Sequence, residues 1–569
     1  MTAALAVVLV PTAAEGATAL LPGVTYERQV RIVGGSGVVL HVLRAPKHGG
    51  LYGFRPVLSH GTVLGRQTIP AMQRGLRRRA TAVGVNADFS RWDDGRPSGI
   101  FLRDGVLANR PYGRRSALGI AFDGRLVVKR FRFVGSWQAA GSVEHPLEEF
   151  NRPLASPPGM ALFTPRWGGL TPRSRRAVDV VLRRFPRVLP NGYPTGTVVE
   201  LRRGGGTAVP RRGAVLHARG FWRDVVRREA QPGTSVTVHI QVPRLPLDVA
   251  DAVGGGPVLV RDGEAVVGAD EAFTFDQISY RHPRTAVGQL ANGRVILVVA
   301  DGRSSVSAGL TIAQLAREMV RLGAVTAMNL DGGGSSILAV DGRVLNRPSD
   351  GSPRPVANGL FVLYYGVYAP PLRRRVISPN GDGVIDSQTL RAKIVRRSGV
   401  RVRLVRPNGT VAWRYRDRVD PGWISHRVGP TTRMANGRWR WIADAVDLVS
   451  GRESRMERAF TVNKTLGFLT LSKERMRVVA GRGGRLDVSV NVTRAARLAV
   501  VVRNAAGVRR RTLFSGDVGR GRPSWRWDGR NDAGRVVRSG VYTVTVRAVN
   551  AIGAVSLRKA VRVVRVRAS

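Results

Sequence analysis

Hydrophobic and polar positions are patterned most clearly in the middle of the chain. A near-continuous β-branched run over 294–300 predicts a strand covered on both faces, and Asp301 follows it. Thr311 then begins a segment whose apolar residues recur at helical spacing. A second apolar run over 324–330 ends at Asp331 and a glycine run. Strand, helix and strand in this order predict a βαβ crossover with parallel strands, which places both aspartates at one edge of a sheet.

The same pattern occurs near the N-terminus. Thr68 begins a predicted helix, an apolar strand follows, and that strand ends at Asn86 and Asp88. These two residues follow Thr68 at the same offsets at which Asn329 and Asp331 follow the start of the later helix. The match indicates an internal duplication, and it predicts that Asp88 and Asp331 lie on related loops.

The second half of the chain has a different pattern. Pro370 and Pro371 interrupt an apolar segment and mark a linker. Beyond them, short alternating runs separated by Asn-Gly and Asp-Gly turns predict small all-β sandwiches, with a weaker boundary near 463–465. The predicted organisation is a signal peptide over 1–19, an α+β (mixed α/β) domain over 20–368, and two Ig-like β-sandwiches over 372–462 and 463–569.

The first residues favour export. An apolar run over 4–10 is followed by small residues up to Ala19, which is typical of a signal peptide, although a positively charged leader is missing. A buried strand is the alternative interpretation. No later run reaches the length of about 18 apolar residues that suggests a membrane-spanning helix, so no transmembrane segment is predicted. We expect a secreted or cell-surface protein.

Composition changes this picture in two ways. The 569 residues include no cysteine, which excludes disulfides, zinc–thiolate sites and a cysteine nucleophile. Lysine and arginine number 91 against 39 acidic residues, a formal net charge of +52. Only six of the basic residues are lysine, and the arginines are spread along the whole chain, which indicates the codon bias of a GC-rich genome. We expect no specific nucleic-acid partner, although such a charge attracts cell-envelope polyanions.

Polar and glycine-rich blocks follow one another between about residues 20 and 365. They are Asn86-Ala-Asp-Phe89, Pro97-Ser-Gly99, Gly254-Gly-Gly-Pro257, His282-Pro-Arg-Thr-Ala-Val-Gly288, Ala300-Asp-Gly-Arg303, Asn329-Leu-Asp-Gly-Gly-Gly-Ser-Ser336, Asn346-Arg-Pro-Ser-Asp350 and Arg354-Pro-Val-Ala-Asn358. In this order the blocks resemble the phosphodiester glycosidase family, apart from Ser90, where relatives often have an aromatic residue. The resemblance implies a hydrolase that cleaves a sugar-1-phosphodiester, for example of N-acetylglucosamine, to free sugar and a phosphomonoester.

The resemblance and the predicted sheet edge together suggest roles. Cleavage at an anomeric carbon needs carboxylates, and a phosphate needs cationic donors. We predict catalytic roles for Asp331 and Asp301, with Asp88 as a third carboxylate and Asn86 as an orienting residue. Which carboxylate is acid, base or nucleophile stays open. The predicted substrate-binding residues are Arg284, Arg303 and Arg347 for the phosphate, the N–H groups of Gly332, Gly333 and Gly334, the hydroxyls of Ser335 and Ser336, and Asp350 and Asn358 for the sugar.

Two further resemblances lie in the C-terminal part. Ser378-Pro-Asn-Gly-Asp-Gly383 resembles the start of bacterial cell-surface Ig-like modules, and residues 527–542 resemble the Ig-like domain of the flagellar hook-capping protein. Asn380, Asp382 and Asp386 offer oxygen ligands for calcium in a glycine-rich loop. Their spacing departs from the EF-hand pattern, and a plain turn is the alternative. No other metal or cofactor is predicted.

Two other functions fit the same residues. A non-catalytic surface protein could bind glycans on the same fold, or the net charge could bind polyanions. Carboxylates of Asp301 and Asp331 that lie apart in the folded protein would favour the first, and a one-sided basic face the second. Residues 136–250 form a predicted strand-rich insert, a lid or a substrate-selecting element, which contains Glu144, Glu148 and Glu149.

Overall fold

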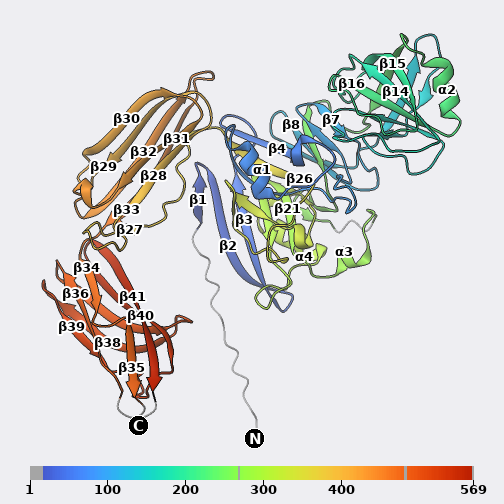
Figure 1. The fold of residues 1–569 in the computed structure, drawn as a ribbon. Helices are drawn as coiled ribbons and strands as arrows, with labels where there is room; N and C mark the ends of the chain where they lie inside the picture. The colour runs from blue at the N-terminus through green and yellow to red at the C-terminus, as the bar shows by residue number, and fades with distance from the viewer. Residues whose placement is uncertain (1–16, 267–269, 480–482, 567–569) are drawn as a thin grey trace, which may run out of the picture. The chain divides into compact units, whose positions relative to one another are not determined.

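The computed structural model describes residues 17–266, 270–479 and 483–566 (Figure 1). It divides into two compact units between Tyr365 and Gly366. Strands account for 51% and helices for only 7%. The prediction of an α+β (mixed α/β) domain is therefore wrong, because the structure is nearly all β. Within the described residues only three strand pairs are parallel, and none lies in the sheet that leads to Asp331.

The error has a physical origin in one inserted strand. Helix α4 (Ile312–Arg321) lies between β22 (Val295–Ala300) and β23 (Ala324–Asn329), as predicted, and Thr311 and Gln314 form its capping box. The two strands do not pair, however, because β21 (Arg284–Leu290) lies between them and is antiparallel to both. β22 and β23 therefore run in the same direction within an antiparallel sheet. The local pattern defined the elements but could not show which strand separates them.

This sheet is the largest layer near the candidate site. Its strand order is β1-β2-β3-β22-β21-β23-β19-β20. The remaining members are β1 (Thr18–Leu21), β2 (Val24–Val33), β3 (Ser36–Ala45), β19 (Val258–Arg261) and β20 (Glu264–Ala265). Leu315 and Met319 of α4 are fully buried in the core that the helix shares with β3, β21 and β22. The short helix α3 (Phe275–Ser279) precedes β21.

A second sheet of the first unit carries the earlier repeat, in the order β25-β24-β5-β26-β4. Its strands are β4 (Tyr52–Leu58), β5 (Thr81–Asn86), β24 (Leu338–Val340), β25 (Arg343–Val344) and β26 (Asn358–Tyr364). Helix α1 (Ile69–Leu76) begins at the N-cap Thr68, whose side chain accepts a hydrogen bond from the Ala71 N–H. Ile69 and Met72 are buried in one cluster with Phe361 of β26. Short 3-10 turns lie at η1 (Ser59–Gly61) and η2 (Gly333–Ser335).

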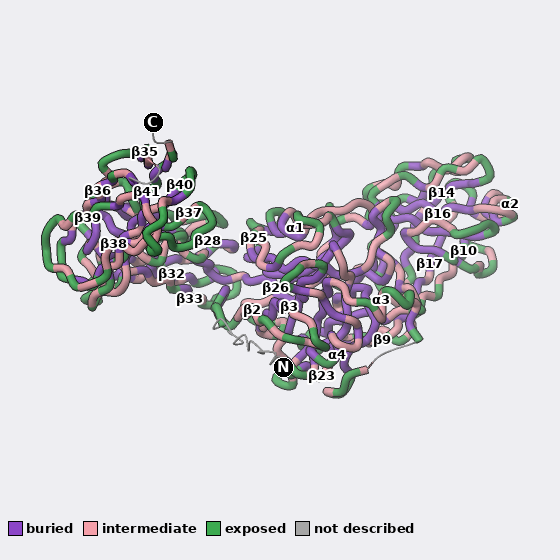
Figure 2. The backbone as a smooth tube through the Cα atoms, turned by 90° about the horizontal axis from the view of Figure 1, so that it is seen from below, coloured by how far each residue is buried: buried purple, intermediate pink, exposed green. Residues whose placement is uncertain are grey.

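The prediction of a strand-rich insert over 136–250 is confirmed. An eight-stranded sheet has the order β11-β10-β17-β15-β14-β16-β13-β12, and a five-stranded sheet has the order β7-β6-β18-β8-β9. The first consists of β10 (Val134–Ala139), β11 (His145–Pro146), β12 (Glu149–Phe150), β13 (Gly159–Phe163), β14 (Ala177–Arg183), β15 (Thr195–Arg203), β16 (Gly213–Arg219) and β17 (Ser235–Gln241), with helix α2 (Trp222–Glu229). The second consists of β6 (Phe101–Arg103), β7 (Val106–Asn109), β8 (Ala117–Ala121), β9 (Leu126–Lys129) and β18 (Val249–Gly254). Residues of both sheets share one hydrophobic core (Figure 2).

The second unit is built of antiparallel sheets apart from its edge strands. Its first sheets have the orders β27-β33-β32-β29-β30 and β28-β31, and its second sheets have the orders β34-β36-β39 and β35-β41-β40-β37-β38. The strands are β27 (Val376–Ile377), β28 (Gln388–Ile394), β29 (Ser398–Val405), β30 (Val411–Val419), β31 (Gly422–Val428), β32 (Gly437–Asp447), β33 (Glu453–Val462), β34 (Leu466–Leu471), β35 (Arg475–Val479), β36 (Leu486–Val492), β37 (Ala496–Asn504), β38 (Arg509–Val518), β39 (Ser524–Trp527), β40 (Gly540–Asn550) and β41 (Gly553–Val566), with a 3-10 turn η3 (Pro430–Thr432). Trp527 is fully buried in the core of the last two sheets.

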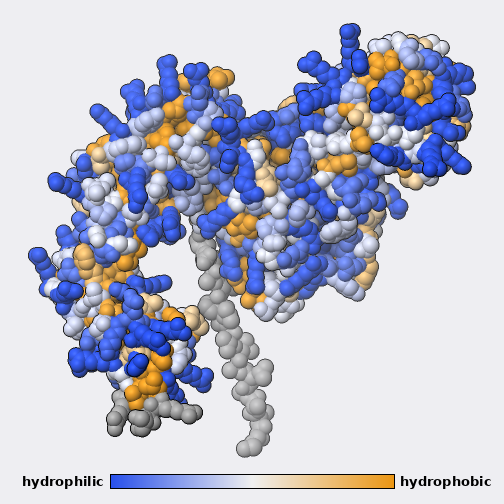
Figure 3. All heavy atoms as spheres, viewed as in Figure 1, coloured by the Kyte–Doolittle hydropathy of each residue, from blue (hydrophilic) through white to orange (hydrophobic). Residues whose placement is uncertain are grey.

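The N-terminal residues and the surface provide little evidence about function. Of the predicted signal peptide, residues 1–16 lie outside the described residues, and Thr18 and Ala19 pair with β2. No helix in the described part of the chain is long and apolar enough to span a membrane. On the face in Figure 3, hydrophilic side chains are spread over many elements rather than gathered in one patch.

Candidate active site

The loops that follow β5 and β23 meet, as the repeat predicted. The Asp331 N–H donates to the Ala87 carbonyl at 2.8 Å, and the Asn86 side-chain amide donates to the Asp331 carbonyl at 2.6 Å. The Asn86 side-chain oxygen accepts a hydrogen bond from the Thr285 hydroxyl at 2.9 Å. Asn86 is fully buried. Its amide therefore joins the two loops from within, and it orients the backbone of Asp331.

Two adjoining cavities open beside Asp331. The first, of about 180 Å³, is lined by Phe273, His282 and the glycine run. The second, of about 350 Å³, is lined by Trp92 and Ser335. The residues that line both are Phe89, Gln277, Asp331 and Arg354. Of the predicted site residues, the first cavity brings together Arg284, Arg303, Asp331, Gly332, Gly333 and Gly334. Asp331 therefore has the central position that the sequence predicted.

Asp88 lines neither cavity, but it interacts electrostatically with Asp331. Its side chain is 2% exposed, and one carboxylate oxygen accepts the Gly99 N–H at 2.6 Å. Burial raises the pKa of Asp88 to about 7; the Gly99 N–H and the charge of Arg115 oppose the shift, and the charge of Asp331 adds to it. Burial likewise raises the pKa of Asp331 to about 6, against hydrogen bonds from Ser335 and Gly332. Raised pKa values of interacting carboxyl groups are typical of catalytic sites.

Arg115 is the cation that sequence reasoning missed. Its guanidinium lies 4.2 Å from the ring centroid of Phe273 and 5.0 Å from that of Phe89. Its Nε–H donates to the Ala272 carbonyl at 2.9 Å. The charges of Asp88 and Asp331 both raise the pKa of this arginine, against a larger lowering by burial. Arg115 belongs to no recognisable block, so among so many arginines nothing in the sequence distinguished it.

Arg354 and Trp92 form the outer wall of the second cavity. The Arg354 guanidinium pairs with Asp350 at 2.6 Å and lies 5.1 Å from the Trp92 ring centroid. Trp92 is 71% exposed. Asp350 was predicted to bind sugar, but in this structure its carboxylate is paired with Arg354. A Cβ on Gly334 would meet the Arg354 guanidinium and the Asp350 carboxylate, so a larger residue there would displace this pair.

The predicted phosphate arginines have different surroundings. Arg284 is 5% exposed and donates to the backbone carbonyls of Leu310 and Tyr280. Burial lowers its pKa to about 10. Arg303 extends over Gly333 and donates to the His282 ring at 3.1 Å. Both side chains line the first cavity, but two N–H groups of Arg284 are already engaged by backbone.

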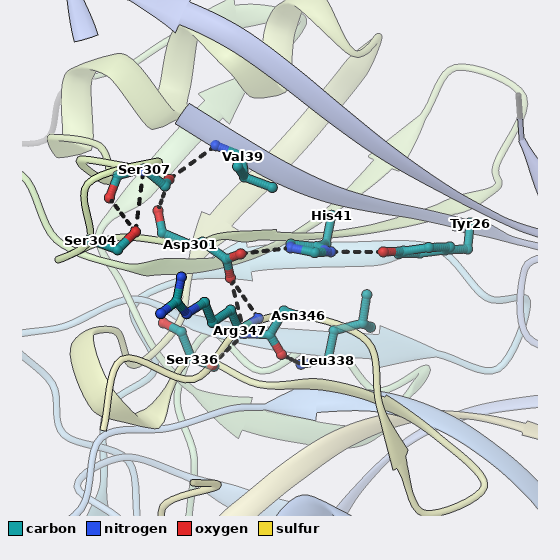
Figure 4. Close-up of polar contacts among 10 residues, drawn as sticks. All are labelled: Tyr26, Val39, His41, Asp301, Ser304, Ser307, Ser336, Leu338, Asn346 and Arg347. Atoms are coloured by element: carbon teal, nitrogen blue, oxygen red, sulfur yellow. Dashed lines mark hydrogen bonds and ion pairs between the residues drawn. The ribbon is translucent and has the colours of Figure 1, made fainter. Parts of the chain in front are cut away.

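Asp301 is held in a separate buried network (Figure 4). One carboxylate oxygen contacts His41 Nε2 at 3.0 Å, and His41 Nδ1 contacts the Tyr26 hydroxyl at 2.8 Å. The other oxygen accepts the backbone N–H of Arg347 at 3.0 Å and the side-chain amide of Asn346 at 3.4 Å. Asp301 lines neither cavity. Because β21 lies between β22 and β23, the two strand ends are roughly 10 Å apart.

Separation of Asp301 from Asp331 is what a non-catalytic protein would show. Asp88 interacts electrostatically with Asp331, but like Asp301 it lines neither cavity. Asp331 is therefore the one of these three predicted carboxylates that lies in the arginine-containing pocket.

The remaining predicted residues contribute from the periphery. Asn358 is fully buried, and its side-chain oxygen accepts the Asp88 N–H at 2.8 Å, so it positions the loop of Asp88. Arg347 is exposed and lines neither cavity. Ser336 is 2% exposed and also lines neither, whereas Ser335 lines the second. A Cβ on Gly254 would lie 2.5 Å from the Asp88 carboxylate, so this glycine permits the close approach of β18.

The proposed calcium loop uses its carboxylates internally. The two oxygens of Asp386 accept the N–H groups of Asn380, Gly381 and Gly383 at 2.6–3.2 Å. Asp382 accepts the Val384 and Phe468 N–H groups at 2.8 Å. Among the described residues no group of three or more His, Cys, Asp or Glu side chains is arranged to hold a metal ion. The carboxylates are thus bonded to backbone N–H groups of the loop and of Phe468, and calcium binding stays a prediction.

Comparison with known proteins finds related families for two regions of the chain. The model of the phosphodiester glycosidase family matches residues 193–363. This region of the chain is similar to phosphodiester glycosidase domains. Residues 476–551 match the FlgD Ig-like domain. The phosphodiester glycosidase match contains Asp331, Arg303 and Arg354, whereas Asp88 and Arg115 precede it.

Individual relatives cover short parts of the chain. The SPbeta prophage-derived uncharacterized protein YomE of Bacillus subtilis is 38% identical over 91 residues, which are 16% of this chain and 14% of that protein. The mouse N-acetylglucosamine-1-phosphodiester alpha-N-acetylglucosaminidase is 31% identical over 102 residues, 16% of this chain and 20% of the enzyme. The chain thus spans a fifth or less of these two relatives. A hypothetical protein from Synechocystis of known structure has a TM-score of 0.52 at 22% identity over 60% of this chain and 62% of its own, a likeness of fold.

Proposed function

We propose that the first unit hydrolyses a sugar-1-phosphodiester. The observation that carries this proposal is Asp331, which lines both cavities with Arg354 and the second cavity with Arg115, and which interacts electrostatically with Asp88. In the reaction the bond between the anomeric carbon and the phosphate oxygen breaks. The hydroxyl of a water molecule adds to the carbon, and its proton leaves with the phosphomonoester or to solvent. The similarity to an N-acetylglucosamine-1-phosphodiester hydrolase supports this class of substrate.

Asp331 is the carboxylate that contacts the anomeric centre, because it lines both cavities. Its negative charge stabilises the positive charge that develops on the sugar. Arg115 and Arg354 hold the phosphate and neutralise the leaving group, since guanidinium groups bind phosphate oxygens in pairs. Phosphate is a good leaving group, so a strong general acid is not required. Asp88 retains a proton near neutral pH and thereby limits the negative charge beside Asp331.

The exposed Trp92 provides a flat apolar surface at the cavity edge, which suits one face of a sugar ring. We also propose that the enzyme acts outside the cell, on envelope or extracellular glycan. That part of the proposal rests on the prediction of a signal peptide over 1–19 and on the family of the C-terminal Ig-like domain.

The deciding experiment is hydrolysis of N-acetylglucosamine-1-phosphate methyl ester by purified protein and by Asp331→Asn. The substitution removes the charge at the anomeric centre, and we expect kcat/KM to fall by about 10³-fold or more. Asp262→Asn is the matched control, because Asp262 lies in an exposed turn with φ 53°, which asparagine tolerates. A folded Asp331→Asn variant as active as Asp262→Asn would refute the assignment, and absence of hydrolysis by the parent would favour glycan binding without catalysis.

A further inference from the structure

A third cavity lies beside the candidate active site and belongs to no role assigned so far. It has a volume of about 580 Å³ and is lined by Arg96, Arg110, Arg115 and Arg152. It shares Ser98 and Arg115 with the second active-site cavity. All four arginines precede the segment that matches the phosphodiester glycosidase family. Arg115 therefore forms a wall common to the reaction site and to this cavity.

Arg96 has donors that nothing in the described protein uses. The residue is 7% exposed, yet its Nε and Nη1 atoms have no hydrogen-bond partner among the described residues. Only the remaining Nη2 approaches a carboxylate, that of Asp94 at 3.6 Å. Burying an unsatisfied donor of a charged group is unfavourable. Other protein atoms enclose both of these donors, however, so an anion in the cavity would contact Arg96 only through Nη2 and would interact with its charge.

Arg152 shows the same shortage of partners. Its Nη2–H donates to the Ser98 carbonyl at 2.8 Å, and its Nε has no partner among the described residues. Burial, with the charge of Arg110, lowers its pKa to about 10. Arg110 differs, because its guanidinium forms a two-pronged pair with Glu149. Five arginines line the cavity, Arg91 among them, against the three carboxylates of Asp93, Asp94 and Glu149, so positive charge is in excess.

The residues that line the cavity indicate which kind of anion it would bind. Guanidinium groups arranged around a space match phosphate oxygens, which accept paired N–H donors. Pro97, Pro153 and Leu154 supply an apolar side, and Tyr112 an aromatic one, so the space suits an organic phosphate as well as a bare ion. Asp331 lies in the reaction site, Arg115 lies in the wall shared by the two cavities, and Arg152 lies in the third cavity. A substrate bound along this line would place its anomeric carbon at Asp331, its scissile phosphate at Arg115 and a second phosphate at Arg152.

We infer that Arg96 and Arg152 bind a second phosphate on the leaving-group side of the substrate. The preferred substrate is then a glycosyl phosphodiester whose leaving group carries another phosphate. This inference rests on the proposed function for its substrate, but the anion site itself does not. Nucleoside diphosphate sugars and glycosyl phosphoglycerol phosphates share this chemistry, and they differ in the spacing of the two phosphates.

The kinetic test compares substrates with one and two phosphates. For Arg152→Gln we expect kcat/KM to fall about 10- to 100-fold on UDP-N-acetylglucosamine or on N-acetylglucosamine-1-phosphoglycerol 3-phosphate, whichever the parent prefers. On N-acetylglucosamine-1-phosphate methyl ester the change should stay below about threefold. Arg211→Gln is the matched control, because Arg211 is exposed and lines none of the three cavities. Equal losses on both substrate classes, or no loss on either, would overturn the inference.

A binding test separates this site from the catalytic proposal. Inorganic phosphate should raise the thermal midpoint of the parent and of Asp331→Asn, since a ligand that binds only the folded state stabilises it. The shift should disappear in Arg152→Gln and persist in Arg211→Gln. If Arg152→Gln does not fold, Arg152→Lys serves, with a shift smaller than that of the parent. An unchanged shift in either Arg152 variant refutes the site even if hydrolysis is observed, and loss of the shift supports it even if no hydrolysis is found.

Discussion

Asp301 and Asp331 follow two strands that run in the same direction in one sheet, yet their surroundings differ. Asp301 has both carboxylate oxygens engaged, by His41 and by the Arg347 N–H among others. Asp331 lines two cavities and has a raised pKa. The residues are alike in sequence position, and the difference comes from partners on other elements. A carboxylate at a strand end is therefore available for chemistry only when the neighbouring loops leave it at the surface of a cavity.

The largest expected effect separates the two aspartates by activity. Asp331→Asn should lower kcat/KM by about 10³-fold or more with an unchanged thermal midpoint. Asp301→Asn should retain activity within about tenfold per folded molecule, because its carboxylate does not contact the cavities. Hydrolysis assays normalised to folded protein measure both. Comparable activity losses in the two folded variants would contradict the contrast.

Stability should show the reverse order. Replacing His41 with Leu leaves the Asp301 carboxylate buried without its ring partner, and breaking a buried pair costs about 3–5 kcal/mol. We expect the free energy of unfolding in urea to fall by roughly this amount. The control is Asp331→Asn, which should change it by less than about 1 kcal/mol. A His41→Leu variant as stable as the parent would show that the network carries little stability.

Close packing around Asp88 can be tested by replacing glycine residues with alanine. Gly254→Ala would place a Cβ 2.5 Å from the Asp88 carboxylate, and such overpacking costs about 1–3 kcal/mol. Gly75→Ala is the control, because a Cβ there meets nothing within 4 Å on the exposed face of α1. That variant should gain up to about 1 kcal/mol from helix propensity. Thermal unfolding distinguishes the two, and equal midpoints would remove the argument for a tight Asp88 pocket.

The last prediction concerns pH. The pKa of Asp88 is raised to about 7 in the folded protein, so the folded state binds a proton that the unfolded state releases above about pH 4. The free energy of unfolding therefore falls as pH rises from about 4 to about 7, by at most about 1.4 kcal/mol per pH unit for this group. Asp88→Asn should flatten this slope. Urea titrations across this pH range measure the change in the free energy of unfolding with pH. A slope unchanged by Asp88→Asn would show that another group binds the proton.

Local patterns predicted much of the local structure. Helix α4 and its capping box, the strands on either side, and the two Asn-x-Asp loops lie where the sequence indicated. Blocks of family-like sequence predicted Arg303, Asp331 and the glycine run at the cavity. The fold class was wrong, because helix and strand alternation resembles an α/β unit when an intervening strand comes from elsewhere in the chain.

The sequence by itself determined which residue types stand at each strand end, because turns, caps and periodicity are local properties. Only the tertiary structure decided which of them face a cavity. Insertion of β21 separated Asp301 from Asp331, and the meeting of two loops brought Asp88 beside Asp331. Arg115 and Arg152 gained their positions in the same way, through packing between segments far apart in the chain. The charge and the burial of a site residue depend on such distant partners. The spacing of residues along the chain does not show which distant segments will pack against one another.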